Sequence, residues 1–137
     1  MLNFYVSPLL CLREYAMFIL PCGNYLKYVM RTIQRSVAVI RPKSPFIKWA
    51  NTCYAESFYD PDDSTVFLIP SLLSLDALPT TMGWRYINSA WDDIFKEMLQ
   101  RWEETEWRWP QYRSRKTFGE WFKVEFHTLV IDGAVLE

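Results

Sequence analysis

The stretch YINSAWDDIFKEMLQRW, residues 86–102, decides the fold. Its apolar residues recur every three or four positions, which is the spacing of one face of an α-helix. On the other face, Asp92 and Lys96 stand four residues apart with the acid first, the order that stabilises a helix surface. The spacing therefore predicts a long amphipathic helix. Its buried side would hold Ile87, Ala90, Trp91, Ile94, Phe95, Met98, Leu99 and Trp102.

Two short β-branched runs precede this helix. The run SVAVIR (residues 36–41) stops at Pro42, and the run TVFLIP (residues 65–70) itself ends in proline. This composition between turn residues is typical of strands. Between the runs, Ser44 is a candidate N-cap and Pro45 a candidate first helical residue, so a short helix is expected there.

After the long helix, the chain predicts one more short helix and one more strand. Ser114 is a candidate N-cap for the helix, and residues 123–131 have the alternation and final apolar run of a strand. Residues 71–83 mix Ser, Pro, Thr and Gly with leucines and predict a loop with room for a single helical turn. The order is β-α-β-α-α-β. We therefore expect an α+β fold, in which a small three-stranded sheet packs on the long amphipathic helix and on shorter helices.

Composition bounds the class of protein. Half of the 137 residues are apolar, and 15 basic residues stand against 16 acidic ones, which fits one globular domain and gives no general attraction to nucleic acid. The three cysteines form no CxxC pair, so we expect a reducing, cytoplasmic location. The apolar run at residues 15–20 is too short to span a bilayer and lacks a signal-peptide pattern, which predicts no membrane association.

The composition changes near Ser36. Residues 1–35 are richer in apolar residues and poorer in charged ones than the remainder, and they show no sustained period. We expect residues 1–35 to be an N-terminal extension outside the core, either an additional packing element or sequence ahead of a natural start at Met17 or Met30. Residues 36–137 would then form a single α+β domain.

The only histidine, His127, is the one candidate for acid–base chemistry near neutral pH. Glu125 lies two residues away, on the same face of the predicted strand, and a carboxylate there could orient the imidazole ring. These two residues are the candidate catalytic pair. The alternation of the strand also explains both polar positions without any catalytic role, and we favour that interpretation.

Metal and cofactor motifs are weak. A single histidine excludes multi-histidine sites, and four glycines offer little material for a phosphate-binding loop. Asp60, Asp62 and Ser64 match the first ligands of a calcium loop, but the required glycine and final glutamate are missing, so we interpret them as a turn. Cys53 lies in a helical setting that suits a buried thiol better than a nucleophile. We expect neither a metal nor a cofactor.

The segment 101–116 interleaves aromatic and basic residues. Such residues can anchor a protein partner or stack on bases and sugars. Glutamates at 103, 104 and 106 cancel much of the local positive charge that phosphate binding needs. A buried tryptophan-rich hinge over the sheet edge and the end of the long helix also explains the composition, and we favour that interpretation. The candidate binding residues are Trp107, Arg108, Trp109, Tyr112 and Arg113.

Several aromatic motifs together resemble a family of small bacterial proteins of about one hundred residues, an ordinary size for one domain, known as a domain of unknown function. The resemblance covers roughly residues 36–132. It implies domain limits, and it implies no activity. The motifs are V-x-V-I-x-P-x-x-P-F at 37–46, V-F-L-I-P at 66–70, W-x-x-I-F at 91–95, W-P at 109–110 and F-x-x-W-F-x-V-E-F-H at 118–127.

The sequence favours a non-enzymatic cytoplasmic domain that acts through protein–protein contacts, with another protein or a second copy of itself as partner. One alternative is a small hydrolase or transferase that uses His127 and Glu125. Another is a nucleic-acid or carbohydrate binder that uses the segment 101–116, and the local glutamates count against nucleic acid.

Overall fold

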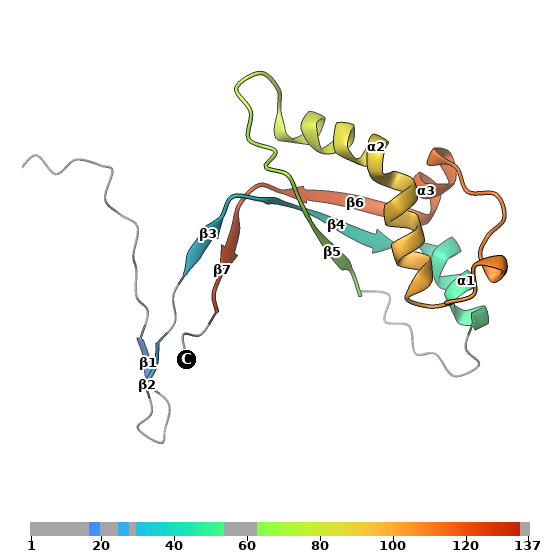
Figure 1. Ribbon diagram of the computed structural model, residues 1–137, viewed down its shortest axis with the longest axis horizontal. Coiled ribbons are helices and arrows are strands. Elements are labelled where there is room, and N and C mark those ends of the chain that lie inside the picture. The colour runs from blue at the N-terminus through green and yellow to red at the C-terminus, as the bar shows by residue number, and fades with distance from the viewer. Residues whose placement is uncertain (1–16, 20–24, 28–29, 54–62, 135–137) are drawn as a thin grey trace, which may run out of the picture. The chain divides into compact units, whose positions relative to one another are not determined.

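The computed structural model describes residues 17–19, 25–27, 30–53 and 63–134 (Figure 1). The chain divides into two compact units, one of residues 34–129 and one of residues 1–33 with 130–137. The larger unit confirms the α+β class and the predicted element order. It contains β4 (Ser36–Pro42), α1 (Ser44–Cys53), β5 (Thr65–Ile69), α2 (Pro79–Gln100), the 3-10 turn η1 (Glu106–Arg108), α3 (Arg115–Trp121) and β6 (Phe122–His127).

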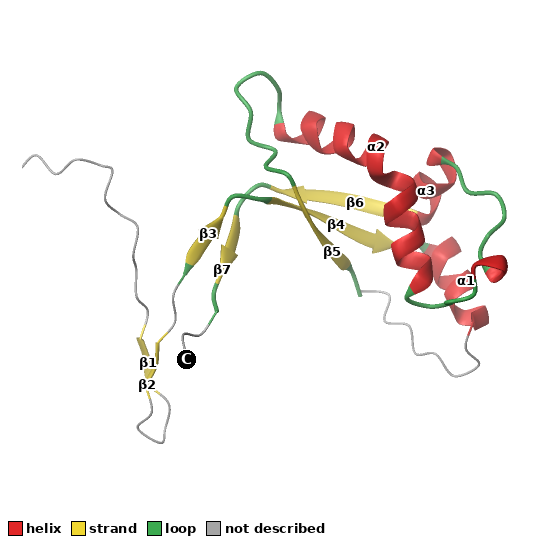
Figure 2. Cartoon of the chain, in the orientation of Figure 1, coloured by secondary structure: helices red, strands yellow, loops and turns green. Residues whose placement is uncertain are grey.

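The three strands of this unit form one antiparallel sheet in the order β5-β4-β6, and the helices lie beside it (Figure 2). β4 is central, so Ala38 pairs with Phe67 on one side and with Phe126 on the other. Strand alternation gives these residues one face of the sheet. Val66 and Leu68 of β5 belong to the opposite face and are more than half exposed. The sheet therefore has one covered face and one open face.

The core lies between the covered face and the helices. Ala38, Ile40 and Ile69 contribute from the sheet, and Phe46 and Ala50 from α1, all of them fully buried. The predicted stripe of α2 is confirmed: Ile87, Ile94, Phe95, Met98 and Leu99 are buried, and Ala90, Trp91 and Trp102 are partly buried against them. On the outer face, the Asp92–Lys96 pair forms at 2.6 Å.

The long helix begins earlier than the sequence predicts. α2 starts at Pro79, whose fixed φ suits a first helical residue, and it runs through Gly83. The predicted loop is confirmed over residues 71–78, whereas residues 79–83, where the prediction allowed one helical turn, are the start of α2. Gly83 has a tertiary role in this helix. A Cβ at Gly83 would lie 2.7 Å from the ring of Phe126, so only glycine allows this close approach of α2 to β6.

The two short helices lie where the sequence predicts them. α1 begins at Ser44, one residue earlier than predicted, and the backbone N–H of Ile47 donates to the carbonyl of Lys43 at 3.2 Å, so Ser44 is not its N-cap. Ser114 caps α3, because its side-chain oxygen accepts a hydrogen bond from the backbone N–H of Thr117 at 3.0 Å. α3 then leads directly into β6, whose first residue, Phe122, is buried.

The last predicted strand is two strands. β6 ends at His127, and β7 (Val130–Asp132) pairs antiparallel with β3 (Arg31–Ile33) in the smaller unit. That unit also contains the antiparallel pair β1 (Met17–Ile19) and β2 (Tyr25–Lys27). The extension predicted for residues 1–35 stays a prediction. The first two aspartates of the predicted 60–64 turn lie outside the described residues.

Candidate functional site

Residues 103–113, which we call the tryptophan loop, join α2 to α3 and contain the five candidate binding residues. The structure separates their aromatic side chains. Trp109 belongs to the core and is only 6% exposed, whereas Trp107 is 77% and Tyr112 is 92% exposed. Of two tryptophans that are two residues apart, one is thus buried in the core and the other is exposed to solvent.

The shape of the loop depends on Glu103, which is 8% exposed. Its carboxylate accepts a hydrogen bond from the backbone N–H of Thr105 at 3.0 Å and pairs with Arg108 at 2.8 Å. Its backbone carbonyl accepts a hydrogen bond from the indole N–H of Trp109 at 2.6 Å. One residue therefore fixes both the turn and the buried ring.

The pKa of the Glu103 carboxyl is lowered from its ordinary value. The hydrogen bond from the backbone N–H of Thr105 is the largest cause, and the positive charge of Arg108 adds to it; burial acts in the opposite direction. The carboxylate is thus charged at neutral pH and holds Arg108 in place. The guanidinium of Arg108 lies 5.9 Å from the centroid of the Trp107 ring, so the Glu103–Arg108 pair also contacts this exposed ring.

Gln111 and Arg113 complete the frame of the loop. The Gln111 amide donates to the carbonyls of Trp107 and Trp109 at 3.0 and 3.1 Å. Arg113 donates to the carbonyl of Pro110 at 3.0 Å, and its guanidinium lies 5.6 Å from the centroid of Trp109. Of the predicted binding residues, Trp109 and Arg113 thus brace the loop.

The candidate catalytic pair lies on the open face of the sheet. Glu125 and His127 are on the same side of β6, as predicted, but the Glu125 carboxylate engages two cations: one oxygen pairs with Lys123 at 2.9 Å and the other with Arg41 at 3.3 Å. The pKa of the Glu125 carboxyl is lowered. The hydrogen bond from Lys123 is the largest cause, and the hydrogen bond from Arg41 is the second. His127 is exposed. The carboxylate is thus oriented by cations and not by the imidazole.

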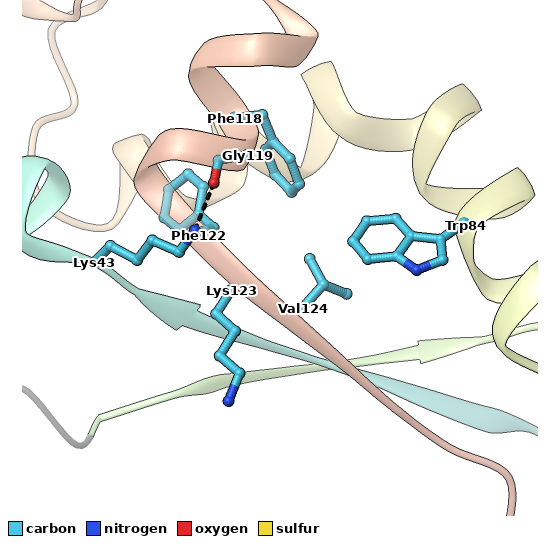
Figure 3. Close-up of a pocket in the computed structure, with 7 residues that line it drawn as sticks. All are labelled: Lys43, Trp84, Phe118, Gly119, Phe122, Lys123 and Val124. Atoms are coloured by element: carbon cyan, nitrogen blue, oxygen red, sulfur yellow. Dashed lines mark hydrogen bonds between the residues drawn. The ribbon is translucent and has the colours of Figure 1, made fainter.

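A cavity of about 240 Å³ lies between α2, α3 and β6 (Figure 3). Neither His127 nor the tryptophan loop contributes to its lining. The sequence does not predict this site, because its residues come from separate elements. A sequence pattern shows that residues lie together only when they belong to the same helix or strand. The lining residues are Lys43, Trp84, Phe118, Gly119, Phe122, Lys123 and Val124.

Cys53, at the end of α1, has the setting of a structural thiol. It is partly buried and donates to the carbonyl of Trp49, with 3.6 Å between sulfur and oxygen. Burial is the main cause that raises the pKa of this thiol, and the negative charge of Glu103 adds to it. A raised pKa keeps the thiol protonated at neutral pH, which disfavours a nucleophilic role.

Three further observations concern the candidate classes. Among the residues that the structure describes, no three His, Cys, Asp or Glu side chains gather closely enough to hold a metal ion. No helix within the described ranges is both long and apolar enough to cross a bilayer. Comparison of the chain with protein-family models, curated proteins and solved structures found no match. The resemblance to the small bacterial domain family stays a prediction.

Proposed function

We propose that this chain is a non-enzymatic cytoplasmic domain that binds a protein partner through Trp107, Arg108 and Tyr112 of the tryptophan loop. The observation that carries the proposal is the exposure of two large aromatic side chains, 77% for Trp107 and 92% for Tyr112, on a loop whose backbone is held by hydrogen bonds to Glu103 and from Gln111. Tryptophan, tyrosine and arginine are the residues that most often dominate the energy of protein interfaces.

The rigidity of the loop supports this role. Association costs free energy when side chains and loops must be ordered on binding. Here the hydrogen bonds to Glu103 and from Gln111 already fix the backbone on both sides of Trp107. Little ordering is left for the complex, so burial of the two rings contributes more fully to affinity.

The charges of the loop favour protein over nucleic acid. Arg108 is paired with Glu103, and the exposed residues Glu104 and Glu106 flank the same turn. A surface of mixed sign has no excess of positive charge for a phosphate backbone. It suits the polar rim of a protein interface, where charges of both signs surround a central aromatic pair.

Site-specific photocrosslinking tests the proposal. A benzophenone amino acid at position 107 or 112, introduced into the full chain in the cells that make it, should give one discrete protein adduct. The matched control is the same amino acid at position 75, because Leu75 is also fully exposed but lies in the loop before α2. An adduct of the chain with itself would identify a second copy as the partner.

The outcome that contradicts the proposal is equally concrete. If positions 107 and 112 give only the diffuse adducts that position 75 gives, the exposed rings do not mark an interface. If Trp107→Ala leaves the adduct at position 112 at full yield, the indole is not an anchor.

A further inference from the structure

Two cations border the cavity between α2, α3 and β6. Lys43 donates to the carbonyl of Gly119 at 2.7 Å, and the close-up shows its side chain reaching this carbonyl (Figure 3). Arg115 donates to Asn88 at 2.9 Å, and its guanidinium lies 5.5 Å from the ring centroid of Trp84. It lies 5.6 Å from the ring of Phe118 as well. Arg115 is not itself a lining residue, but it lies beside three of them, because its Nη1 atom would be 3.6 Å from a Cβ at Gly119.

Neither of these two cations is paired with a carboxylate of the described residues, in contrast to Lys123 beside them. Within the part of the chain that the structure describes, neither Lys43 nor Arg115 has a carboxylate within 4.0 Å. Lys123, which also lines the cavity, is paired with Glu125, and its side chain points away from the aromatic rings (Figure 3). The cavity lining contains no acidic residue. The site is therefore positive on balance.

Gly119 leaves the space between the two cations open. It lies inside α3 without a positive φ, and a Cβ there would meet only Arg115 Nη1, at an ordinary 3.6 Å. Glycine inside a helix costs about 1 kcal/mol relative to alanine. Gly83 has a packing reason for its missing side chain, and Gly119 has none. Gly119 also lines the cavity, so a larger side chain at this position would change the lining.

The lining fixes the chemistry of a ligand. Trp84, Phe118, Phe122 and Val124 present rings and a branched aliphatic group, and the two cations favour a negative charge. At about 240 Å³ the cavity is smaller than the sites that hold drug-sized molecules, so the apolar body would be a single ring or a short branched chain. We propose that this cavity binds a small organic carboxylate with a compact apolar body.

Binding of phenylacetate to the full-length protein tests this proposal. The indole N–H signal of Trp84, assigned with Trp84→Phe, should shift and saturate, with a dissociation constant in or below the millimolar range. Phenylacetamide has the same shape without the charge, and it should bind roughly tenfold more weakly. Inorganic phosphate has the charge without the apolar body and should also bind more weakly.

Variants locate the site. Lys43→Met and Arg115→Met should each weaken phenylacetate binding roughly tenfold, because each keeps an apolar stem and loses the charge. Gly119→Leu should abolish binding by filling the cavity. Lys116→Met is the matched control, since Lys116 is on the same helix, is 87% exposed at its side chain and does not line the cavity; it should bind as the wild type does. Each variant must keep a cooperative thermal transition.

Three results would overturn the proposal. The first is the absence of a saturable shift of the Trp84 signal with phenylacetate. The second is equal affinity for phenylacetate and phenylacetamide, or for phenylacetate and phosphate, in the wild-type protein. The third is unchanged binding in folded Gly119→Leu. The second result needs no variant, so it holds even where a substitution unfolds the domain.

Discussion

The tryptophan loop and the cavity use the same kinds of side chain in opposite ways. In the loop, Trp107 and Tyr112 project into solvent, and the basic residue Arg108 is neutralised by Glu103. In the cavity, the aromatic rings face a hollow, and the cations at its edge are not paired with carboxylates of the described chain. Exposed rings on a neutral frame suit a protein surface. Rings around a positive hollow suit a small anion.

In the tryptophan loop, the residues that stabilise the fold differ from those that we propose to bind a partner. Trp109 and Glu103 are buried and hold the loop, whereas Trp107 and Tyr112 are exposed and contribute little to the core. In the cavity this separation is less complete, because Phe118 and Phe122 both line the hollow and belong to the core. Substitutions in the loop should therefore change either stability or the proposed binding, but not both. In the cavity, only substitutions at Gly119 and at the two cations should change the proposed binding without a loss of stability.

The largest expected effect is at Trp109. Trp109→Ala should lower the free energy of unfolding by about 3 to 5 kcal/mol, because it removes a buried ring from the core and leaves a cavity. Trp107→Ala should change it by no more than about 0.5 kcal/mol, because the ring is exposed. Urea unfolding of both variants measures the difference. Equal losses of unfolding free energy in the two variants would contradict the assignment of Trp109 to the core and of Trp107 to the exposed surface.

The two glycines near the cavity should respond in opposite directions. Gly83→Ala should destabilise the fold by about 1 to 3 kcal/mol, because its methyl group would overlap the ring of Phe126. Gly119→Ala should stabilise it by up to about 1 kcal/mol, because α3 gains a better helix former without a clash. Thermal unfolding monitored by circular dichroism compares the two. A loss of stability in Gly119→Ala would show that this glycine has a packing role after all.

A smaller effect concerns the pH dependence of the loop frame. The pKa of Glu103 is lowered in the folded state, so its carboxylate stabilises the fold above the unfolded pKa, and this stabilisation disappears as the pH falls through the folded pKa. Glu103→Gln should therefore be less stable than the wild type at neutral pH. The two should converge as the pH falls below the unfolded pKa of a glutamate, about 4.3, and through the lower pKa of the folded state.

The exposed neighbour Glu104 provides the control for this titration. Glu104→Gln should stay within about 0.5 kcal/mol of the wild type at neutral pH. Urea unfolding at several pH values tests both variants. A constant gap between Glu103→Gln and the wild type across the acid range would exclude the carboxylate charge as the stabilising feature.

The sequence predicts those parts of the fold that depend on local order. The apolar period around Ile94 and Phe95 locates α2, and Ser114 marks the start of α3, because both signals need only neighbouring residues. The early start of α2 could not be predicted in the same way. Gly83 argues against a helix until the ring of Phe126 is known to lie against it.

The sequence likewise predicts only those parts of the candidate sites that depend on neighbouring residues. The aromatic and basic composition of the segment 101–116 identifies a binding candidate, but it does not tell which indole is exposed, because the burial of Trp109 depends on its tertiary contacts with the core. The cavity joins Lys43 and Trp84 to residues of α3 and β6 that are distant in the chain. The cavity forms only through tertiary packing, so no local sequence pattern predicts it.

The affinity of the partner captured at position 107 tests the central claim most directly. The double variant Trp107→Ala with Tyr112→Ala should bind that partner at least roughly thirtyfold more weakly than the wild type while keeping its stability, because each exposed ring would be an interface hot spot. Gly119→Leu, which alters only the cavity, should bind the partner with unchanged affinity. Unchanged affinity in the double variant, or an equal loss in Gly119→Leu, would contradict the assignment of the tryptophan loop as the protein-binding surface.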